Sequence, residues 1–412
     1  MFFLNFKQIN SMAMSDEERY AWVRLTLEPG IGPVTARHLL VAFGLPQDIF
    51  SASASSLMKV VTQKQALQLA GPVDPAMHAL IERTFEWLAR PGHHLVTLAD
   101  DHYPALLLDT ADPPSLLYVD GDPGILAQPN IAMVGARSAT PGGTDNAFAF
   151  ARHLADAGWG IVSGLAQGID AAAHEGALAS SAALPTIAVM GTGINRVYPA
   201  ANKALAMRIR ERGALISELP LDTAAVVHQF PRRNRIVAGL SRGVLVVEAA
   251  QRSGSLITAR LAGENGREVF AIPGSIHSPL SRGCHALIRQ GAKLVETADD
   301  ILEELSRSGS APVAPTPVGR KRDTSRNVAA GDPPAQARVA RPPVAAGNLI
   351  ADPGQQRLLD TMGHDPVSME LLLVRLGISV GELAGQLTEL EMLGKIVRLP
   401  DGRYLQRVNH LQ

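Results

Sequence analysis

Four loops in the middle of the sequence each follow a run of apolar residues typical of a buried strand. They contain Gly135-Ala-Arg137-Ser138, Gly164-Leu-Ala-Gln-Gly168, Gly191-Thr-Gly193 and Ser253-Gly254-Ser255. Glycine permits a close approach of the backbone to a ligand, and unpaired N–H groups at the start of a helix favour an anion. One such loop is more often an ordinary turn between a strand and a helix. Four along one sheet favour a binding site for phosphate or a nucleotide.

A cluster of positive charge lies between the last two of these loops. The segment His228–Ile236 holds Arg232, Arg233 and Arg235 and contains no carboxylate. Arginine forms paired hydrogen bonds with phosphate oxygens, and Phe230 beside the cluster can stack on an unpaired base. This combination favours nucleic-acid binding, although Phe230 also fits a core position.

Groups that could perform covalent chemistry are few. The sequence contains neither a Gly-x4-Gly-Lys-Ser/Thr phosphate loop nor a His-Glu-x-x-His metal motif. Glu248 ends a predicted strand beside the loops and has the chemistry of a general base, but a glutamate there more often caps a helix or pairs with an arginine. Asp170 is expected to cap its helix, and His174 is expected to be structural. The sequence therefore predicts binding without catalysis, without a cofactor and without a metal.

Composition restricts the charge, the cellular compartment and the partners expected of such a protein. Balanced charge, with 38 Lys and Arg against 39 Asp and Glu, excludes a chain that is basic throughout but allows a local basic strip. The single cysteine, Cys284, cannot form an intrachain disulfide, which favours the cytoplasm. No apolar run reaches the roughly 18–20 residues that cross a bilayer, so no membrane partner is expected. The start Met1–Phe6 makes a poor signal peptide, and folded structure is expected from a helix cap at Ser15.

The elements that hold the loops alternate between about residues 103 and 305. Apolar runs that read as strands alternate with amphipathic helical stretches, which predicts a parallel sheet with helices on both faces. The expected strands are 131–135, 160–164, 186–190, 214–217, 243–248 and 268–272, with helices at 146–157, 201–212 and 256–264. In a sheet of this kind ligands bind at the carboxyl ends of the strands, where the loops lie.

Residues 15 to about 95 read as short helices without a convincing strand. Within them, Glu28–Leu39 fits a helix-hairpin-helix, in which a Gly-x-Gly turn offers N–H groups to a phosphate. The alternative is a helical hairpin used only for packing or protein contact. The acidic Glu28 departs from the phosphate-binding pattern, so both interpretations stay open.

The end of the chain has a different pattern. Residues 306–350 hold seven prolines and seven basic residues against two aspartates, which predicts a mobile basic linker. Three short helices and a hairpin then form the pattern of a winged helix, with Val380, Leu383, Leu387 and Leu390 as the buried stripe of its third helix. The outward face of this helix is acidic, which favours protein contact or packing over the reading of a DNA groove. Arginines around the wing leave DNA contact open.

Taken in order, the core motifs resemble those of the DNA-processing protein A family, also called Smf, over roughly residues 95–300. The shared motifs are Gly135-x-Arg137, Ser163-Gly-Leu-Ala-x-Gly-Ile-Asp170, Gly191-Thr-Gly193, Tyr198-Pro199, Phe230-Pro-x-Arg-Asn-Arg235, Glu248 with Ser253-Gly-Ser255, and Pro273-Gly274. The resemblance implies a core that binds single-stranded DNA, forms a homodimer and delivers the RecA recombinase to strands taken up in natural transformation. It also implies that Arg137 and Arg235 bind phosphate, that Phe230 lines the same pocket, and that the N-terminal module is similar to a sterile alpha motif.

The sequence thus predicts an α/β protein: an extended Rossmann-like parallel-sheet core with an N-terminal all-helical module and a C-terminal winged-helix module. The expected segments are 1–95 (helical), 96–305 (core), 306–350 (linker) and 351–412 (winged helix). The candidate DNA-binding residues are Gly135, Arg137, Ser138, Gly164, Gly168, Gly191, Gly193, Phe230, Arg232, Arg233, Arg235, Ser253, Gly254 and Ser255. The apolar stretches 256–261 and 285–288 are candidate dimer faces.

Two other classes of protein stay open beside a DNA-binding mediator. One is a Rossmann-like nucleotide phosphoribohydrolase, an enzyme whose Pro-Gly-Gly-x-Gly-Thr pattern is replaced here by Gln251-Arg-Ser-Gly-Ser255. The other is a scaffold whose loops bind nothing.

Overall fold

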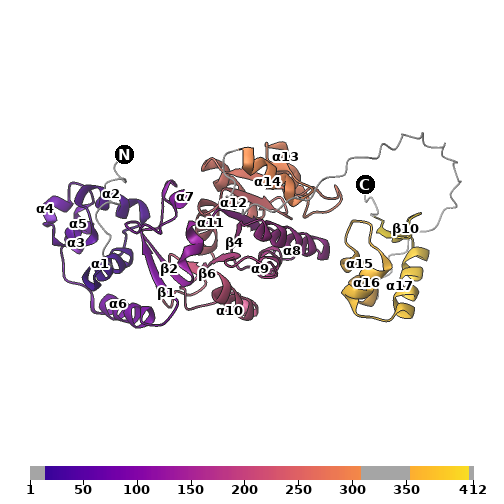
Figure 1. The fold of residues 1–412 in the computed structure, drawn as a ribbon, viewed down its shortest axis with the longest axis horizontal. Coiled ribbons are helices and arrows are strands. Elements are labelled where there is room, and N and C mark those ends of the chain that lie inside the picture. The colour runs from indigo at the N-terminus through magenta and orange to yellow at the C-terminus, as the bar shows by residue number, and fades with distance from the viewer. Residues whose placement is uncertain (1–13, 308–352, 408–412) are drawn as a thin grey trace, which may run out of the picture. The chain divides into compact units, whose positions relative to one another are not determined.

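The computed structural model describes residues 14–307 and 353–407 (Figure 1). The chain divides into two compact units, Met1–Pro312 and Val313–Gln412. Two predictions concern residues outside the described ranges: the poor signal peptide at Met1–Phe6 and the basic linker at 306–350. Only the first two residues of that linker are described, and they end the last helix of the first unit.

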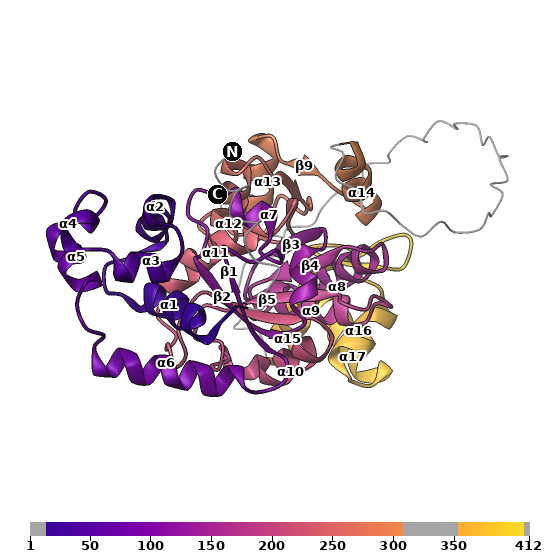
Figure 2. The same ribbon diagram turned by 60° about the vertical axis from the view of Figure 1, so that its left-hand side comes forward.

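A nine-stranded sheet forms the centre of the first unit (Figure 2). The strand order is β1-β2-β6-β5-β4-β3-β7-β8-β9. The strands are β1 (His93–Thr97), β2 (Leu116–Gly121), β3 (Asn130–Val134), β4 (Gly160–Ser163), β5 (Thr186–Val189), β6 (Ala214–Ser217), β7 (Gly243–Val246), β8 (Glu268–Ala271) and β9 (Lys293–Leu294). In this spatial order, every pair of neighbouring strands from β6 across the sheet to β9 is parallel. Strand β2 is antiparallel to both of its neighbours, β1 and β6. Strands β3, β4, β5, β6 and β7 are buried along their whole length, as expected when helices cover both faces. The predicted Rossmann-like parallel sheet is confirmed.

Strand β1 joins the helical module to the sheet, because it lies across the predicted boundary between residues 95 and 96. His93 pairs with Asp120 of β2, and Thr97 pairs with Leu116. The sequence pattern predicts no strand at His93–Thr97. β1 is only partly buried and includes His93 and His94, so it lacks the apolar run that marks the parallel strands.

Helices cover the two faces of the sheet. They are α8 (Pro141–Asp156), α9 (Ile169–Leu178), α10 (Lys203–Arg212), α11 (Gln229–Gly239), α12 (Gly254–Glu264), α13 (Arg282–Arg289) and α14 (Ala298–Arg307). Ile131 and Met133 of β3 pack in one core with α8, α9 and α14, whereas Ala132 and Val134 pack in another with α11 and α12. Because alternate residues of a strand point to opposite faces, β3 anchors both layers.

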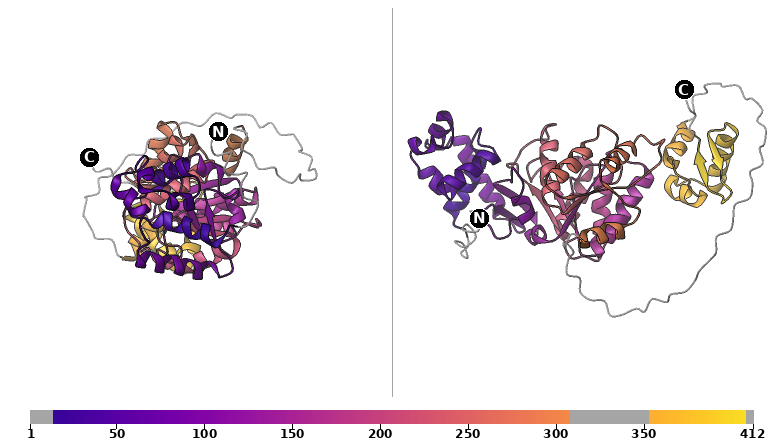
Figure 3. Two further views of the ribbon diagram at one scale, coloured as in Figure 1. Left: turned by 90° about the vertical axis from the view of Figure 1, so that its left-hand side faces the viewer. Right: turned by 90° about the horizontal axis from the view of Figure 1, so that it is seen from above.

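The helical module lies at the β1 end of the sheet (Figure 3). Its helices are α1 (Asp16–Leu27), α2 (Pro33–Phe43), α3 (Pro46–Ser51), α4 (Ala54–Leu57), α5 (Gln63–Leu69) and α6 (Pro75–Leu88), and a short α7 (Ala105–Leu108) follows β1. Ser15 caps α1 as predicted, since its Oγ accepts a hydrogen bond from the N–H of Glu18 at 3.2 Å.

The turn between α1 and α2 is packed against α5. Glu28 is buried in this turn and accepts hydrogen bonds from Nε of Arg24 at 3.0 Å and from Nε2 of Gln68 at 2.6 Å. The carbonyl oxygen of Gly30 accepts a hydrogen bond from Nε2 of Gln65 at 3.0 Å. The turn therefore carries a buried acid and is held by neighbouring helices, which favours the packing alternative over a phosphate site.

The second unit is a winged helix with its own core, as predicted. It consists of α15 (Pro353–Met362), α16 (Met369–Leu376), α17 (Val380–Met392) and the antiparallel strands β10 (Ile396–Arg398) and β11 (Tyr404–Gln406). Leu383, Leu387 and Leu390 are buried, but Val380 is 61% exposed, so its predicted place in the buried stripe is wrong. Val380 directly follows the cap Ser379, and at this first helical position its side chain extends beyond the core.

The helices of the winged helix are short and partly acidic on their outer surface. Glu382 and Glu389 of α17 are exposed, as the sequence predicts.

Among the described residues, no single helix is long and apolar enough to cross a membrane. α16 and α17 pass that test only as a pair, across a bend of 115°.

Candidate nucleic-acid interface

A cavity of about 200 Å³ lies where the carboxyl end of β3 meets the first turns of α11 and α12. Its lining consists of Val134, Gly135, Arg137, Ala166, Asp170, Phe230, Pro231, Arg233, Asn234, Ser253, Gly254, Ser255 and Thr258. These residues come from the loops after β3, β4 and β7 and from the start of α11. The segments are distant in the sequence and meet because parallel strands end at the same edge of the sheet.

The loop glycines mainly make room for protein side chains. A Cβ atom on Gly164 would lie 2.3 Å from Nη2 of Arg233, and one on Gly191 would lie 2.7 Å from Cδ1 of Phe230. Neither glycine lines the cavity. The other predicted loop residues outside the lining are Ser138, Gly168 and Gly193. Only Gly135 and Gly254, of the predicted glycines, offer backbone to a ligand in this cavity.

The guanidinium of Arg233 is buried and holds α11 against the sheet. Its Nη1 donates hydrogen bonds to the carbonyl oxygens of Gly164 and Val189, at the ends of β4 and β5. Asp170 accepts hydrogen bonds from the N–H groups of Gly164 at 3.1 Å and Ala166 at 3.3 Å. Burial raises the pKa of Asp170 and lowers the pKa of Arg233, and the opposite charge of each residue counteracts the shift in the other. Nη1 of Arg233 is thus used within the protein, although the side chain also lines the cavity.

Arg232 and Arg235 do not line the cavity and instead pair with carboxylates. Nη2 of Arg235 donates a hydrogen bond to Glu218, and Nε of Arg232 lies 3.3 Å from the same carboxylate. Asp112 lies 3.0 Å from Nε of Arg235, whose side chain is 9% exposed. This ion-pair cluster engages Arg235 within the protein, whereas the resemblance implies that Arg235 contacts phosphate. The sequence did not show it because Glu218 and Asp112 lie far from the basic segment along the chain.

Arg137 is the cation that the cavity presents to solvent. Its side chain is exposed and forms no hydrogen bond or ion pair with residues 14–307 or 353–407. The guanidinium lies 5.8 Å from the ring centroid of Phe230, which is half-buried. A positive charge and an aromatic ring therefore lie side by side at one cavity.

The N-terminus of α12 adds a second anion-binding group. Ser253 caps this 11-residue helix, and its Oγ accepts a hydrogen bond from the N–H of Ser255 at 3.3 Å. Both serines and Gly254 line the cavity. The positive end of the helix dipole therefore points to the same space as Arg137.

Glu248 is engaged at another helix terminus. Its Oε2 accepts a hydrogen bond from the N–H of Thr140 at 2.9 Å, and its Oε1 accepts one from the Thr140 hydroxyl at 2.5 Å. Thr140 caps α8, so the carboxylate lies at the positive end of that helix. Glu248 is outside the cavity lining, and its position is that of a capping glutamate.

The remaining titratable candidates are buried and unreactive. Burial lowers the pKa of His174 to about 3, so the ring is neutral, and its Nδ1 lies 2.7 Å from the hydroxyl of Thr186. Burial raises the pKa of the Cys284 thiol to about 12, so it stays protonated. In the part of the chain that the structure describes, no group of three His, Cys, Asp or Glu residues could hold a metal ion. The arrangement is suited to non-covalent binding of an anion beside an aromatic ring.

A parallel α/β sheet with a cation and a helix N-terminus at its carboxyl edge defines a Rossmann-like protein with an anion-binding edge. The chain belongs to the DNA recombination-mediator protein A family, since residues 94–306 match this family. Residues 333–402 match the DprA winged helix domain.

Relatives from several bacteria share most of their length with this chain. Protein Smf of Escherichia coli strain K12 is 40% identical over 341 residues, which cover 81% of this chain and 83% of the relative. DNA processing protein DprA of Streptococcus pneumoniae strain R6 is 47% identical over 208 residues, or 50% of this chain and 73% of the relative. The X-ray structure of the Streptococcus pneumoniae DNA processing protein A aligns with a TM-score of 0.62 at 36% identity, covering 71% of this chain and 99% of that one.

Replacement of Arg233 tests whether its buried hydrogen bonds fix the site. We expect Arg233→Met to lower the free energy of unfolding by about 2–4 kcal/mol, because two carbonyl oxygens and the Asp170 carboxylate lose their partner. Urea denaturation at neutral pH measures the change. The neighbouring Arg232→Met is the matched control, with an expected loss of about 1 kcal/mol or less, since Arg232 is 47% exposed. Equal stability of the two variants would contradict the anchoring role of Arg233.

Proposed function

We propose that this protein binds single-stranded DNA at the cavity beside Arg137 and delivers the recombinase RecA to the bound strand, without altering a covalent bond. The observation that carries the proposal is the free guanidinium of Arg137 next to the half-buried ring of Phe230. Guanidinium groups bind phosphate, and an aromatic ring stacks on a base that is not paired. The family's description as a recombination mediator supports the second half of the proposal.

The geometry suggests how a strand is held. A phosphate between Arg137 and the start of α12 would meet the guanidinium together with the backbone N–H groups near Gly254. Gly135 lines the same cavity, and Ser138 lies exposed beside Arg137. Arg232, Arg233 and Arg235 support this binding through their contacts within the protein. A duplex cannot offer a base face to Phe230 without first opening, which favours single strands.

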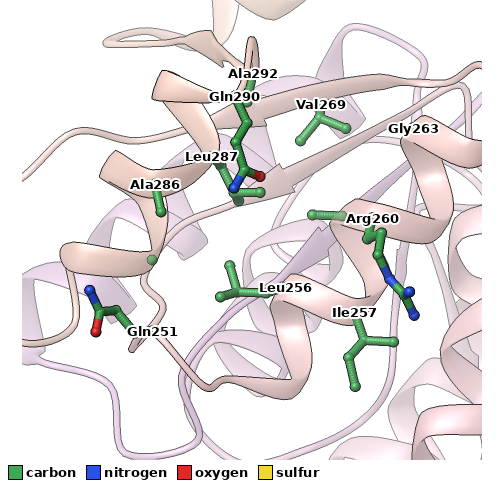
Figure 4. Close-up of a pocket in the computed structure, with 12 residues that line it drawn as sticks. Gln251, Leu256, Ile257, Arg260, Gly263, Val269, Ala286, Leu287, Gln290 and Ala292 are labelled. Atoms are coloured by element: carbon green, nitrogen blue, oxygen red, sulfur yellow. The ribbon is translucent and has the colours of Figure 1, made fainter.

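A second copy of the chain is the partner we propose for an apolar groove between α12 and α13. The groove has a volume of about 510 Å³, and Leu256, Ile257, Val269 and Leu287 line it (Figure 4). Its walls include both sequence stretches expected to form a dimer face. Covering this apolar lining with a second copy would stabilise a homodimer. A mediator that meets DNA and RecA in this way would act in the cytoplasm.

A nucleotide phosphoribohydrolase is the rival function from another class. The base that the sequence suggested for this reaction is Glu248, whose carboxylate instead accepts hydrogen bonds from Thr140. Binding without catalysis therefore fits the positions of the described residues better than hydrolysis does.

The affinity for single-stranded and double-stranded DNA tests the proposed binding. We expect a matched single-stranded oligonucleotide to bind more tightly than its duplex, with an affinity that falls as salt rises. Arg137→Ala should weaken the complex by about 1–3 kcal/mol, roughly 5- to 150-fold, through loss of a charged hydrogen bond. Gel shifts over a salt series measure both effects.

Arg208→Ala is the matched control for this measurement. Arg208 is also an exposed arginine, pairs with Glu175 and lies outside the cavity. The control should bind as the unmodified protein does. If Arg137→Ala also binds normally while folded, the cavity is not the DNA site.

The mediator activity makes a separate prediction. On strands pre-coated with single-strand-binding protein, this protein should speed the assembly of RecA filaments, and Arg137→Ala should lose most of that effect. Filament assembly can be followed by the ATP hydrolysis of RecA. A protein that binds the strands tightly yet leaves assembly unchanged would refute delivery of RecA but keep strand binding.

The rival enzyme is tested with nucleoside monophosphates. We expect no release of free base above background, whether Glu248 is intact or replaced in Glu248→Gln, because the carboxylate caps α8. Chromatography of the products measures release. Base release that Glu248→Gln abolishes would establish the hydrolase instead.

A further inference from the structure

A second aromatic side chain, Tyr198, continues the surface that Phe230 begins. Their ring centroids lie 5.4 Å apart, and the ring planes are tilted by 41°. Tyr198 is 50% exposed, so part of its ring is open to solvent. It lies in the loop after β5 and is outside the cavity lining, so the binding described above does not use it.

The Tyr198 loop is held firmly beside the cavity. Nδ2 of Asn202 donates hydrogen bonds to the carbonyl oxygens of Leu165 at 2.9 Å and Ala166 at 3.1 Å. Ala166 itself lines the cavity. The exposed ring is thus fixed at the edge of the site by contacts on its own loop as well as by Phe230.

The two rings cannot hold one base between them. A base stacked on both faces needs parallel rings about 7 Å apart, twice the stacking distance. The observed separation is shorter and the planes are tilted. Each ring therefore offers its own free surface, and two rings in contact suit two neighbouring bases of one strand.

We propose that Tyr198 is a second base-stacking residue, which receives the nucleobase next to the one on Phe230. This inference rests on the proposed binding of single-stranded DNA and adds a subsite to it. The phosphate between the two nucleotides is held at Arg137, while the bases lie along the Phe230–Tyr198 surface. Stacking accepts any base, because every base has a flat π-face, so the subsite raises affinity without reading sequence.

Oligonucleotide binding by Tyr198 variants tests the subsite. Tyr198→Ala should weaken binding to oligo(dT) by about 5- to 100-fold, the loss typical of one stacked base. Tyr198→Phe and Tyr198→Trp should bind as the unmodified protein does, because they keep a ring. An abasic oligonucleotide of equal length should bind equally to Tyr198→Ala and to the unmodified protein, since it has no base to stack.

A double variant separates stacking from mere support of Phe230. If Tyr198 contacts its own base, Phe230→Ala with Tyr198→Ala should lose clearly more affinity than Phe230→Ala alone. If Tyr198 only supports the Phe230 ring, the double variant should match Phe230→Ala, and the inference is wrong. Phe148→Ala, at an aromatic residue 37% exposed on α8, is the control that should change nothing.

Different experimental results would refute the Tyr198 subsite and the DNA-binding site beside Arg137. If the unmodified protein does not bind oligo(dT), or if Arg137→Ala has no effect, the proposed function fails. If both of those expectations hold but Tyr198→Ala binds oligo(dT) normally, only the second stacking residue is refuted. Circular dichroism of each variant confirms that it is folded before its affinity is compared.

Discussion

The buried guanidinium of Arg233 fixes α11 on the sheet, and the arrangement of the site depends on that position. The group donates hydrogen bonds from α11 to carbonyl oxygens at the ends of β4 and β5. Gly164 leaves the space for it, since a Cβ there would overlap the guanidinium. With α11 held in this way, Phe230 lies over Gly191 and beside Arg137. The aromatic part of the site therefore depends on a polar anchor at its base.

The site presents less positive charge to a ligand than its number of arginines indicates. Asp170, Glu218 and Asp112 offset the charges of the α11 arginines, so these residues stabilise the fold with little external field. Arg137 and the N-terminus of α12 are left to attract an anion. A site of this kind binds through a few groups placed together, which agrees with a chain whose overall charge is nearly balanced.

Sequence reasoning succeeded where local pattern decides structure. The six parallel strands β3 to β8 lie where their apolar runs predict them, and loops that follow such strands reach one edge of the sheet, whereas the two-residue parallel strand β9 was not predicted. It failed where distant residues decide the outcome. The partners of Arg235 come from other parts of the chain, so no local pattern separates it from the free Arg137. β1 was missed because its partly buried sequence, with His93 and His94, lacks an apolar run. Val380 was assigned wrongly because the apolar spacing was extended to the first helical position, where the side chain is exposed.

The position of β3 between β4 and β7 has a consequence for synthesis on the ribosome. Its pairing with β4 can form soon after it emerges, because only α8 lies between them in the chain. Its other edge must wait until β5, β6, α11 and then β7 have been made. Throughout that interval the nascent polypeptide exposes an apolar strand edge of the kind that chaperones shield from aggregation. β3, an inner strand of the finished sheet, thus stays half-paired while translation continues.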